Sequence, residues 1–225
     1  MNHPFELKIK GNEKGILPNV FITSDPHYNH KNICFNTTSW RDKKGNVPQN
    51  STRDYKTLSA MNDAIVNGIN KTVGQDDILI IAGDLAFGGA EKVVEFLDRI
   101  VCKNLYLVYG NHDQNIAKNV MNLQDYFIAC YCQLHLSIGK CDFFISHYPT
   151  VSHPGLNRGV LMLHGHVHLN TQNRFGPGQQ MDIGFDGSPE NRPYNIITEC
   201  VSLLKDRPMK SYLPNDHHTE EFTFV

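Results

Sequence analysis

The sequence predicts an α/β fold with a single domain over residues 1–225, a motif-bearing core at about residues 20–200 and a polar tail at 206–225. Two observations predict it. Short apolar, β-prone runs alternate with segments of helical periodicity, which is typical of layered α/β proteins. Clusters of Asp, His and Asn follow the ends of those runs. A chain of 225 residues is long enough to bury one core, and no linker or internal repeat marks a second domain.

The first half of the chain supplies the alternation. Val20–Thr23 predicts a strand, and the spacing of Leu58, Met61, Ile65 and Ile69 predicts a helix over 54–73, with Ser51 or Thr52 as its cap and Gly74 at its end. Further segments follow in order: an apolar strand at 77–82, a helix around 93–101 and a second apolar strand at 105–109.

The second half begins with a hairpin pattern. Residues 126–138 and 141–146 flank Gly139-Lys140, which predicts two antiparallel strands. An apolar strand follows at 160–163, an apolar run at 181–185 leads into a Gly/Pro-rich loop, and 194–204 predicts a helix.

Composition restricts the class of protein. The 21 basic and 23 acidic residues give a formal charge of −2, which argues against nucleic-acid binding through bulk positive charge. A hydrophobic content of 40% excludes a wholly disordered chain, and no apolar run approaches the roughly 20 residues of a membrane span. Charged residues interrupt the first fifteen positions, so we expect no secretory signal and a cytoplasmic location, the host cytoplasm for a phage protein. The six cysteines include no CxxC pair, which excludes zinc-ribbon and thioredoxin-like readings.

Seven polar side chains at the ends of predicted strands form a candidate metal site. Because the carboxyl ends of neighbouring strands meet at one edge of an α/β sheet, we expect them to converge. Carboxylates, imidazoles and an amide oxygen suit divalent Mn, Fe, Zn, Co or Ni, with manganese the expected ion. The set consists of Asp25, His27, Asp84, Asn111, His147, His166 and His168.

Seven ligands exceed the four to six positions of one ion, so the set suggests two ions roughly 3.5–4 Å apart that share a carboxylate. Two divalent ions outweigh the two carboxylates and a bridging hydroxide by about one positive charge. A phosphate is therefore the expected guest, held by the metals rather than by lysines.

The same residues carry a family resemblance. Asp25-Pro-His27, Gly83-Asp84, Gly110-Asn111-His112-Asp113, His147 and Gly165-His166-Val-His168 resemble, in order and spacing, the DxH, GD, GNH(D/E), H and GHxH blocks of calcineurin-like metallophosphoesterases. The blocks span residues 25–168. The sequence around the first block, Ser24–Ile33, is similar to that of the small members of the family found in bacteria and phages. The resemblance implies a four-layer sandwich: two mixed β-sheets flanked by helices.

The resemblance also implies individual roles. One ion would be held by Asp25, His27 and His168, the other by Asn111, His147 and His166, with Asp84 bridging. A bridging hydroxide would attack phosphorus in line with the leaving oxygen, and His112 would act as the acid. Asp113 would either orient His112 or cap the following helix.

Several other residues have open roles. His30 and Arg192 are candidate substrate contacts, and Arg158 and Arg174 could clamp a phosphate in the same way as Arg192, although loop arginines are usually solvated. Trp40 is either a packing anchor or a stacking residue, and His164 is expected to be buried and hydrogen-bonded rather than a ligand. His217 and His218, neighbours in the polar tail, receive no function.

The predicted activity is hydrolysis of a phosphodiester or phosphomonoester of a nucleotide or small phosphorylated molecule, with no membrane partner. Two alternatives stay open. One is a DNA or RNA nuclease of the same superfamily, and the other is a non-catalytic scaffold that keeps the fold. The weak net charge disfavours the first, and the full ligand set disfavours the second.

Overall fold

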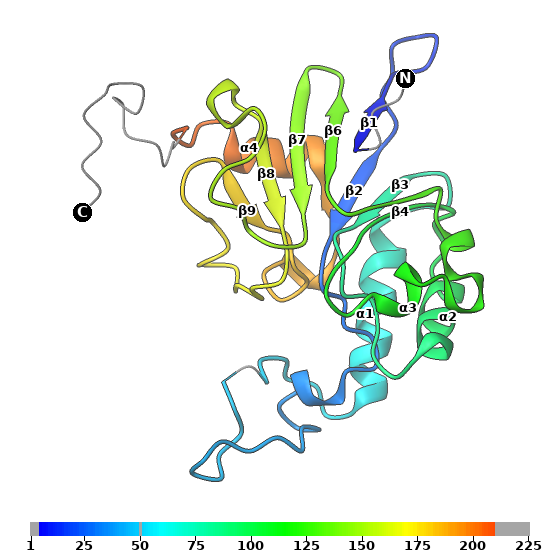
Figure 1. The fold of residues 1–225 in the computed structure, drawn as a ribbon, viewed down its shortest axis with the longest axis vertical. Coiled ribbons are helices and arrows are strands. Elements are labelled where there is room, and N and C mark those ends of the chain that lie inside the picture. The colour runs from blue at the N-terminus through cyan, green and yellow to red at the C-terminus, as the bar shows by residue number, and fades with distance from the viewer. Residues whose placement is uncertain (1–4, 50, 210–225) are drawn as a thin grey trace.

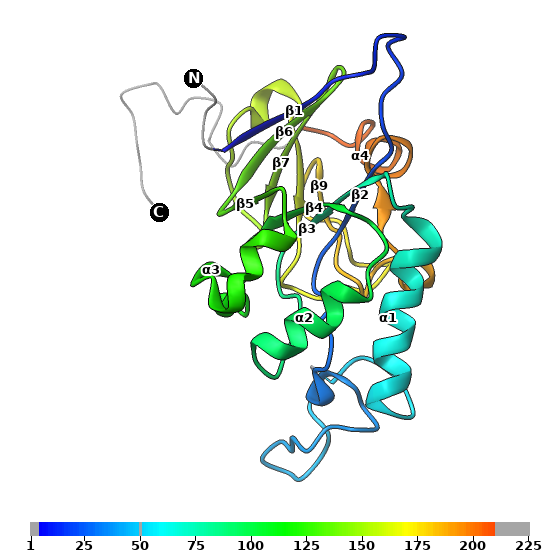
Figure 2. The same ribbon diagram turned by 90° about the vertical axis from the view of Figure 1, so that its right-hand side faces the viewer.

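The computed structural model describes residues 5–49 and 51–209, so most of the polar tail predicted at 206–225, with His217 and His218, lies outside the described residues. Two five-stranded sheets form the body of the molecule, and the helices gather mainly beside one of them (Figures 1 and 2). None of the described helices is long and apolar enough to cross a membrane.

One sheet, here the helix-covered sheet, has the spatial order β10-β2-β3-β4-β5. Strands β2 to β5 are parallel, and β10 pairs with β2 in the antiparallel sense. Their bounds are β2 Val20–Thr23, β3 Ile78–Ile81, β4 Asn104–Val108, β5 Ala129–Tyr131 and β10 Tyr194–Asn195.

The other sheet, here the hairpin sheet, has the order β1-β6-β7-β8-β9. The predicted hairpin forms its antiparallel pair β6–β7, and the remaining pairs are parallel. The bounds are β1 Glu6–Ile9, β6 Leu134–Ile138, β7 Cys141–Ser146, β8 Leu161–His164 and β9 Gln180–Asp182. Two mixed sheets flanked by helices confirm the predicted fold class.

The alternation of side chains along β3 explains the layers. Leu79 and Ile81 point into the core between the helix-covered sheet and its helices, while Ile80 points into the core between the two sheets. A strand buried on both faces is therefore almost wholly apolar, as Ile78–Ile81 is.

Helices α1 (Leu58–Thr72) and α2 (Ala90–Asp98) cover the outer face of this sheet, and α3 (Gln114–Ala117) follows β4. Helix α4 (Val201–Leu204) closes the core between the sheets with its Leu204. Short 3₁₀ segments lie at Lys31–Ile33, Val120–Tyr126, Leu156–Arg158 and Pro189–Asn191, and a π-helical turn at Ile196–Cys200.

Four element predictions need correction. Of the strand predicted over 126–138, only Leu134–Ile138 joins the hairpin, because Ala129–Tyr131 pairs with β4 of the other sheet as β5. Helix α1 begins four residues later than expected, because Thr57, rather than Ser51 or Thr52, caps it by accepting a hydrogen bond from the Ala60 amide at 3.1 Å. Strand β1 was not predicted, since its four residues are mostly exposed and half charged. The segment 194–204 starts as an edge strand before its helical turns, because Tyr194 pairs with Ile22 of β2.

Candidate active site

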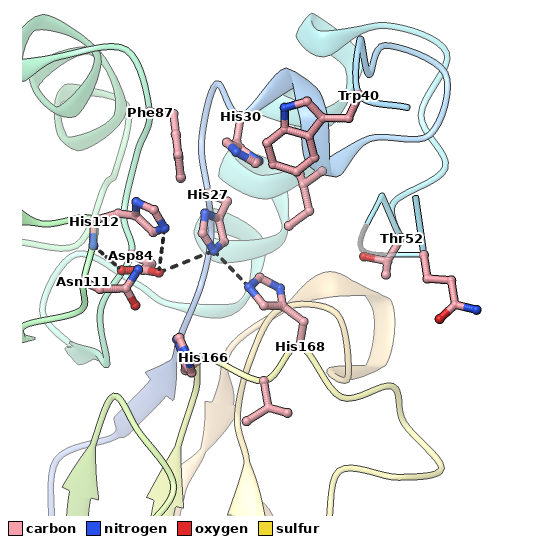
Figure 3. A pocket seen from close by; sticks show the side chains of 13 residues that line it. His27, His30, Trp40, Thr52, Asp84, Phe87, Asn111, His112, His166 and His168 are labelled. Atoms are coloured by element: carbon pink, nitrogen blue, oxygen red, sulfur yellow. Dashed lines mark hydrogen bonds and ion pairs between the residues drawn. The ribbon is translucent and has the colours of Figure 1, made fainter. Parts of the chain in front are cut away.

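The carboxyl ends of five strands meet at one edge of the two sheets, as expected for parallel neighbours. Strands β2, β3 and β4 of the helix-covered sheet lead into three of the polar clusters, and β7 and β8 of the hairpin sheet lead into the other two. All seven candidate ligands flank this edge, and most of them face one cavity (Figure 3).

The backbone at this edge is sharply turned. Five of the seven candidate ligands have left-handed φ angles between 49° and 69°, a conformation that non-glycine residues adopt only at a cost. These residues are Asp25, His27, Asp84, His166 and His168. A left-handed residue cannot continue a strand, so the chain changes direction at these positions after the strands end.

Two glycines allow these loops to pack closely. A Cβ atom on Gly110 would collide with the carboxylate of Asp84, and one on Gly165 would collide with Asp25 and Ser24. Glycine is therefore required at these two motif positions for steric reasons, because a larger residue would push the ligand-bearing loops apart.

The first ligand cluster consists of Asp25, His27 and His168. The Nε2 atoms of the two histidines lie 3.0 Å apart, and they lie 3.5 and 3.6 Å from Oδ1 of Asp25. That Oδ1 is buried without a hydrogen-bond partner among the described residues. A buried carboxylate oxygen facing two imidazole nitrogens is the donor set a divalent cation binds, so these residues fit a metal ion.

The second cluster consists of Asp84, His147 and His166, with Asn111 beside them. Nδ1 of His147 donates to the carbonyl of Ala82 at 2.8 Å, which leaves its Nε2 facing Oδ2 of Asp84 at 3.4 Å and Oδ1 of Asn111 at 3.1 Å. The tautomer set by Ala82 therefore presents Nε2 as the ligand atom.

Asp84 lies between the clusters. Its Oδ2 is 3.7 Å from Nε2 of His27 in the first cluster (Figure 3). The same oxygen is 3.4 Å from Nε2 of His147 in the second. Its Oδ1 accepts the backbone N–H of His112 at 2.8 Å, which fixes the carboxylate plane. One carboxylate thus faces both candidate cation positions.

The pKa values follow from burial and charge. Burial alone would raise the pKa of Asp25, but the close contact with His27 and the nearby imidazoles of His168 and His147 outweigh it and lower the pKa. Burial alone would lower the pKa of His147, but its contacts with Asp84 and Asp25 raise it to about 9. Without metal, the carboxylates of the site therefore hold His147 protonated.

A buried ion pair supports the first cluster from behind. Asp186 accepts a hydrogen bond from Nδ1 of His168 at 2.8 Å and pairs with Arg53 at 2.9 Å. The guanidinium of Arg53 also donates to the carbonyls of Asp25 and Pro26, both at 2.6 Å. Burial alone would raise the pKa of Asp186, but Arg53 and His168 lower it, so the carboxylate stays charged.

The sequence did not lead us to Arg53 or Asp186. Asp186 follows the segment Met181–Phe185, but strand β9 already ends at Asp182, so the pattern used for the other ligands, a polar residue directly after a strand, did not identify it. Arg53 lies in a polar loop before α1 and had no distinguishing signal in the sequence.

Asp113 does not cap α3 through its side chain, and its role in orienting His112 stays a prediction. Its carboxylate accepts backbone hydrogen bonds from Asp84 at 2.9 Å, Leu85 at 3.0 Å and Gly110 at 2.8 Å, and it makes no side-chain cap to α3. It therefore ties the loop after β3 to the loop after β4.

His112 projects into the cavity. Its side chain is 43% exposed, and its Nε2 lies 3.9 Å from Oδ2 of Asp84. The ring of Phe87 packs against it with a centroid distance of 4.5 Å. The imidazole is thus accessible to a ligand beside Asp84 and is positioned by an aromatic neighbour.

The cavity has a volume of about 590 Å³. His27, Asp84, Asn111, His112, His166 and His168 lie on one side, and the ring side chains His30, Trp40 and Phe87 lie on another (Figure 3). The remaining lining residues are Ile33, Gln49, Thr52 and Val167.

The structure separates the candidate substrate contacts. His30 lines the cavity, whereas Arg192 is not among its lining residues and pairs with Glu199 at 2.8 Å; the role of each in substrate binding stays a prediction. Arg158 lines a different hollow, and Arg174 packs over Phe175. His164 is buried, with its Nδ1 3.0 Å from the carbonyl of Gly165, as expected for a residue that is not a ligand.

Comparisons with known proteins agree with this geometry. Residues 18–222 match the family model described as calcineurin-like phosphoesterase. The gene 66 protein of Mycobacterium phage D29 is 23% identical over 215 residues, covering 84% of this chain and 99% of that protein. The protein MJ1445 of Methanocaldococcus jannaschii is 25% identical over 154 residues, covering 67% and 70% of the two chains.

Among solved structures, protein AQ665 of Aquifex aeolicus is similar in fold. Its TM-score is 0.55 at 21% identity, with 78% of this chain and 94% of that chain covered. The family model spans nearly the whole chain, including every strand end that contributes to the site. The chain therefore belongs to the calcineurin-like phosphoesterases.

Proposed function

We propose that this protein hydrolyses phosphodiester or phosphomonoester bonds with the help of two divalent metal ions, of which manganese is the expected one and iron, zinc, cobalt or nickel are alternatives. Asp25, His27 and His168 would hold one ion. Asn111, His147 and His166 would hold the other, and Asp84 would contact both. Bound there, the ions would supply positive charge for the phosphate oxygens and activate the attacking water.

The single observation that carries this proposal is the position of Asp84 between two clusters of imidazole nitrogens, 3.7 Å from His27 and 3.4 Å from His147. One cation would satisfy one cluster and leave the other carboxylate–imidazole group without a partner. Two cations satisfy both groups, because the shared carboxylate lies between them.

His112 is the group positioned to move a proton. In hydrolysis the oxygen of water forms a bond to phosphorus, the bond from phosphorus to the ester oxygen breaks, and the departing alkoxide must gain a proton. The His112 ring faces the cavity beside Asp84 and can donate that proton. Phe87 packs against the ring and limits its rotation.

Arg53, Asp186 and Asp113 act through other residues. Asp186 orients His168, and Arg53 fixes both Asp186 and the carbonyls of Asp25 and Pro26. Asp113 fixes the loops that carry Asp84 and Asn111. These contacts reduce the motion of the ligand atoms before any ion binds.

The test combines metal analysis with turnover. Purified protein reconstituted with Mn²⁺ should contain about two ions per chain and hydrolyse bis-p-nitrophenyl phosphate or p-nitrophenyl phosphate. Each metal in the series Mn, Fe, Zn, Co and Ni is compared after removal of the original metal with a chelator. A folded protein that binds no divalent ion and hydrolyses neither ester would instead support the non-catalytic scaffold.

A further inference from the structure

The ring wall of the cavity consists of Trp40, His30 and Phe87, and no part of the metal-ligand set explains it. The rings form a continuous series: His30 lies 5.6 Å from Trp40 and 3.7 Å from Phe87, and Phe87 lies 4.5 Å from His112. The wall therefore begins at the proposed acid and runs outward from the ligand cluster (Figure 3).

Trp40 is held in place at the outer end of this wall. Its backbone N–H donates to Oγ1 of Thr38 at 3.1 Å, and its carbonyl accepts from Arg41 at 2.6 Å. Thr38 is buried, and its own amide donates to the carbonyl of Cys34 at 3.0 Å. The loop thus fixes the Trp40 backbone, yet the residue remains 40% exposed and lines the cavity.

The cavity-lining residues, all within the described part of the chain, include no lysine or arginine. A ligand with several phosphates, or a nucleic-acid strand, needs cationic partners along its backbone, and this cavity offers none outside the metal clusters. Uncharged polar groups lie instead on the remaining rim, at Gln49 and Thr52. The lining favours one phosphate joined to a flat, uncharged group with polar edges.

The dimensions agree with that description. Ring-to-ring distances of 5.4 Å from His27 to His30 and 5.6 Å from His30 to Trp40 place the indole no more than two ring steps from the first ligand cluster. A phosphate beside His27 and a base beside Trp40 would be separated by a sugar. Base stacking on aromatic side chains is favourable for every base, because each has a π-face.

From these observations we propose, resting on the proposed function, that the substrate is a nucleoside phosphate ester with a single phosphate, whose base packs against Trp40. His30 and Phe87 bound the space between the base and the reacting phosphate. The apolar area of the indole, exposed in the free protein, is covered when the base binds.

The experiment uses substrates that differ only in the base. Adenosine 5′-(methyl phosphate) is compared with 1-O-methylribose 5-(methyl phosphate), and adenosine 5′-monophosphate with ribose 5-phosphate, so that diesters and monoesters are both covered. We expect kcat/KM to be about 10-fold higher or more with the base in one of the pairs, mostly through KM.

Variants of the intact, Mn²⁺-loaded protein locate the effect. In Trp40→Leu the ratio of kcat/KM with the base to kcat/KM without it should fall toward one. Trp40→Phe should retain most of that preference. Phe35→Leu is the matched control, because Phe35 is exposed in the same loop and does not line the cavity. Its preference should equal that of the unchanged protein.

The outcomes are distinguishable. Turnover without a preference for the base, a preference that survives Trp40→Leu, or faster cleavage of an oligonucleotide than of the nucleoside esters would overturn the base-binding inference while leaving the phosphoesterase proposal intact. Absence of metal binding and of turnover on every substrate, the nitrophenyl esters included, would overturn the proposed function itself.

Discussion

Nδ1 of His168 lies 2.8 Å from Oδ2 of Asp186, and the same carboxylate is paired with the buried Arg53. The imidazole therefore has its Nδ1 fixed as the donor, and its Nε2 faces Asp25 and His27. By contrast, Nδ1 of His27 has no partner among the described residues, and its ring is held by contacts with Phe87 and His30. Of the two histidines in the first cluster, His168 is the one oriented by a carboxylate.

Asp186→Asn should weaken metal binding. The amide cannot supply the negative charge that orients His168 and increases its basicity, so we expect affinity for Mn²⁺ to fall about 10- to 100-fold. Metal titration of the chelator-treated protein checks this. Glu199→Gln is the control, since it removes an ion pair with Arg192 outside the cavity. Equal affinity in the Asp186 variant and the unchanged protein would contradict the role.

Arg53→Met should destabilise the fold even without metal. The substitution leaves the Asp186 carboxylate buried without its cation and removes two donors to the loop after β2, so the free energy of unfolding should fall by about 3–5 kcal/mol. Urea unfolding of the chelator-treated protein measures the change. Lys92→Met, which breaks the exposed pair with Glu95, should cost about 1 kcal/mol or less. Similar losses in both variants would refute a special role for Arg53.

Asp84→Asn should abolish activity and lower the metal content, because this carboxylate faces both clusters. Elemental analysis and turnover of bis-p-nitrophenyl phosphate are measured on the same sample. A variant that retained both ions and full activity would show that Asp84 does not bridge.

His112→Ala should retain both ions and lose rate. General acid catalysis contributes about 100- to 10,000-fold, and the loss should be greatest for esters whose alkoxide is a poor leaving group. The slope of log rate against leaving-group pKa should therefore steepen in the variant. Loss of metal would instead identify His112 as a ligand.

Binding of Mn²⁺ should tighten as the pH rises from about 7 toward 9. His147 has a pKa of about 9 without metal, so below that pH it must lose a proton before Nε2 can bind an ion. Calorimetric titrations in buffers of different ionisation enthalpy should show proton release near pH 7.5. Affinity independent of pH over this range would indicate that His147 is already neutral.

The stability of the metal-free protein should change in the opposite direction. A folded-state pKa raised above the ordinary 6.5 means that protonated His147 contributes stability fully below about pH 6.5, and that this contribution is lost as the pH rises to about 9. His168, whose pKa is raised by Asp186, contributes in the same direction, whereas burial lowers the pKa values of His27 and His30, so these two do not add to the trend. In His147→Gln the decline in unfolding free energy should be reduced.

The sequence predicted the elements whose periodicity and length are distinctive. The parallel strands β2, β3 and β4, the hairpin β6–β7 and helix α1 have strong apolar patterns, and the polar residues after them lie at one edge because parallel strands share direction. Strand β1 could not be predicted, since its stability comes from pairing with β6 far along the chain.

Within the candidate site, residue type was more predictable than partner. The sequence predicted which side chains would gather, but it did not reveal that backbone amides occupy Asp113 or that Glu199 pairs with Arg192. Such pairings depend on loop conformation, and loops at the site are set by left-handed residues that sequence patterns do not identify.

Those left-handed residues have a consequence for evolution of the fold. At Asp25, His27, Asp84, His166 and His168 a glycine would relieve strain of about 1 kcal/mol each. His166 is the one exposed side chain among the five, so the relief of strain there is not offset by the loss of a buried carboxylate or ion pair, and the metal-free protein should gain stability. We expect His166→Gly, the most exposed of the five, to melt at a higher temperature than the unchanged chain in chelator and at a lower one in excess Mn²⁺. Scaffolds that descend from this fold would be expected to lose these side chains first.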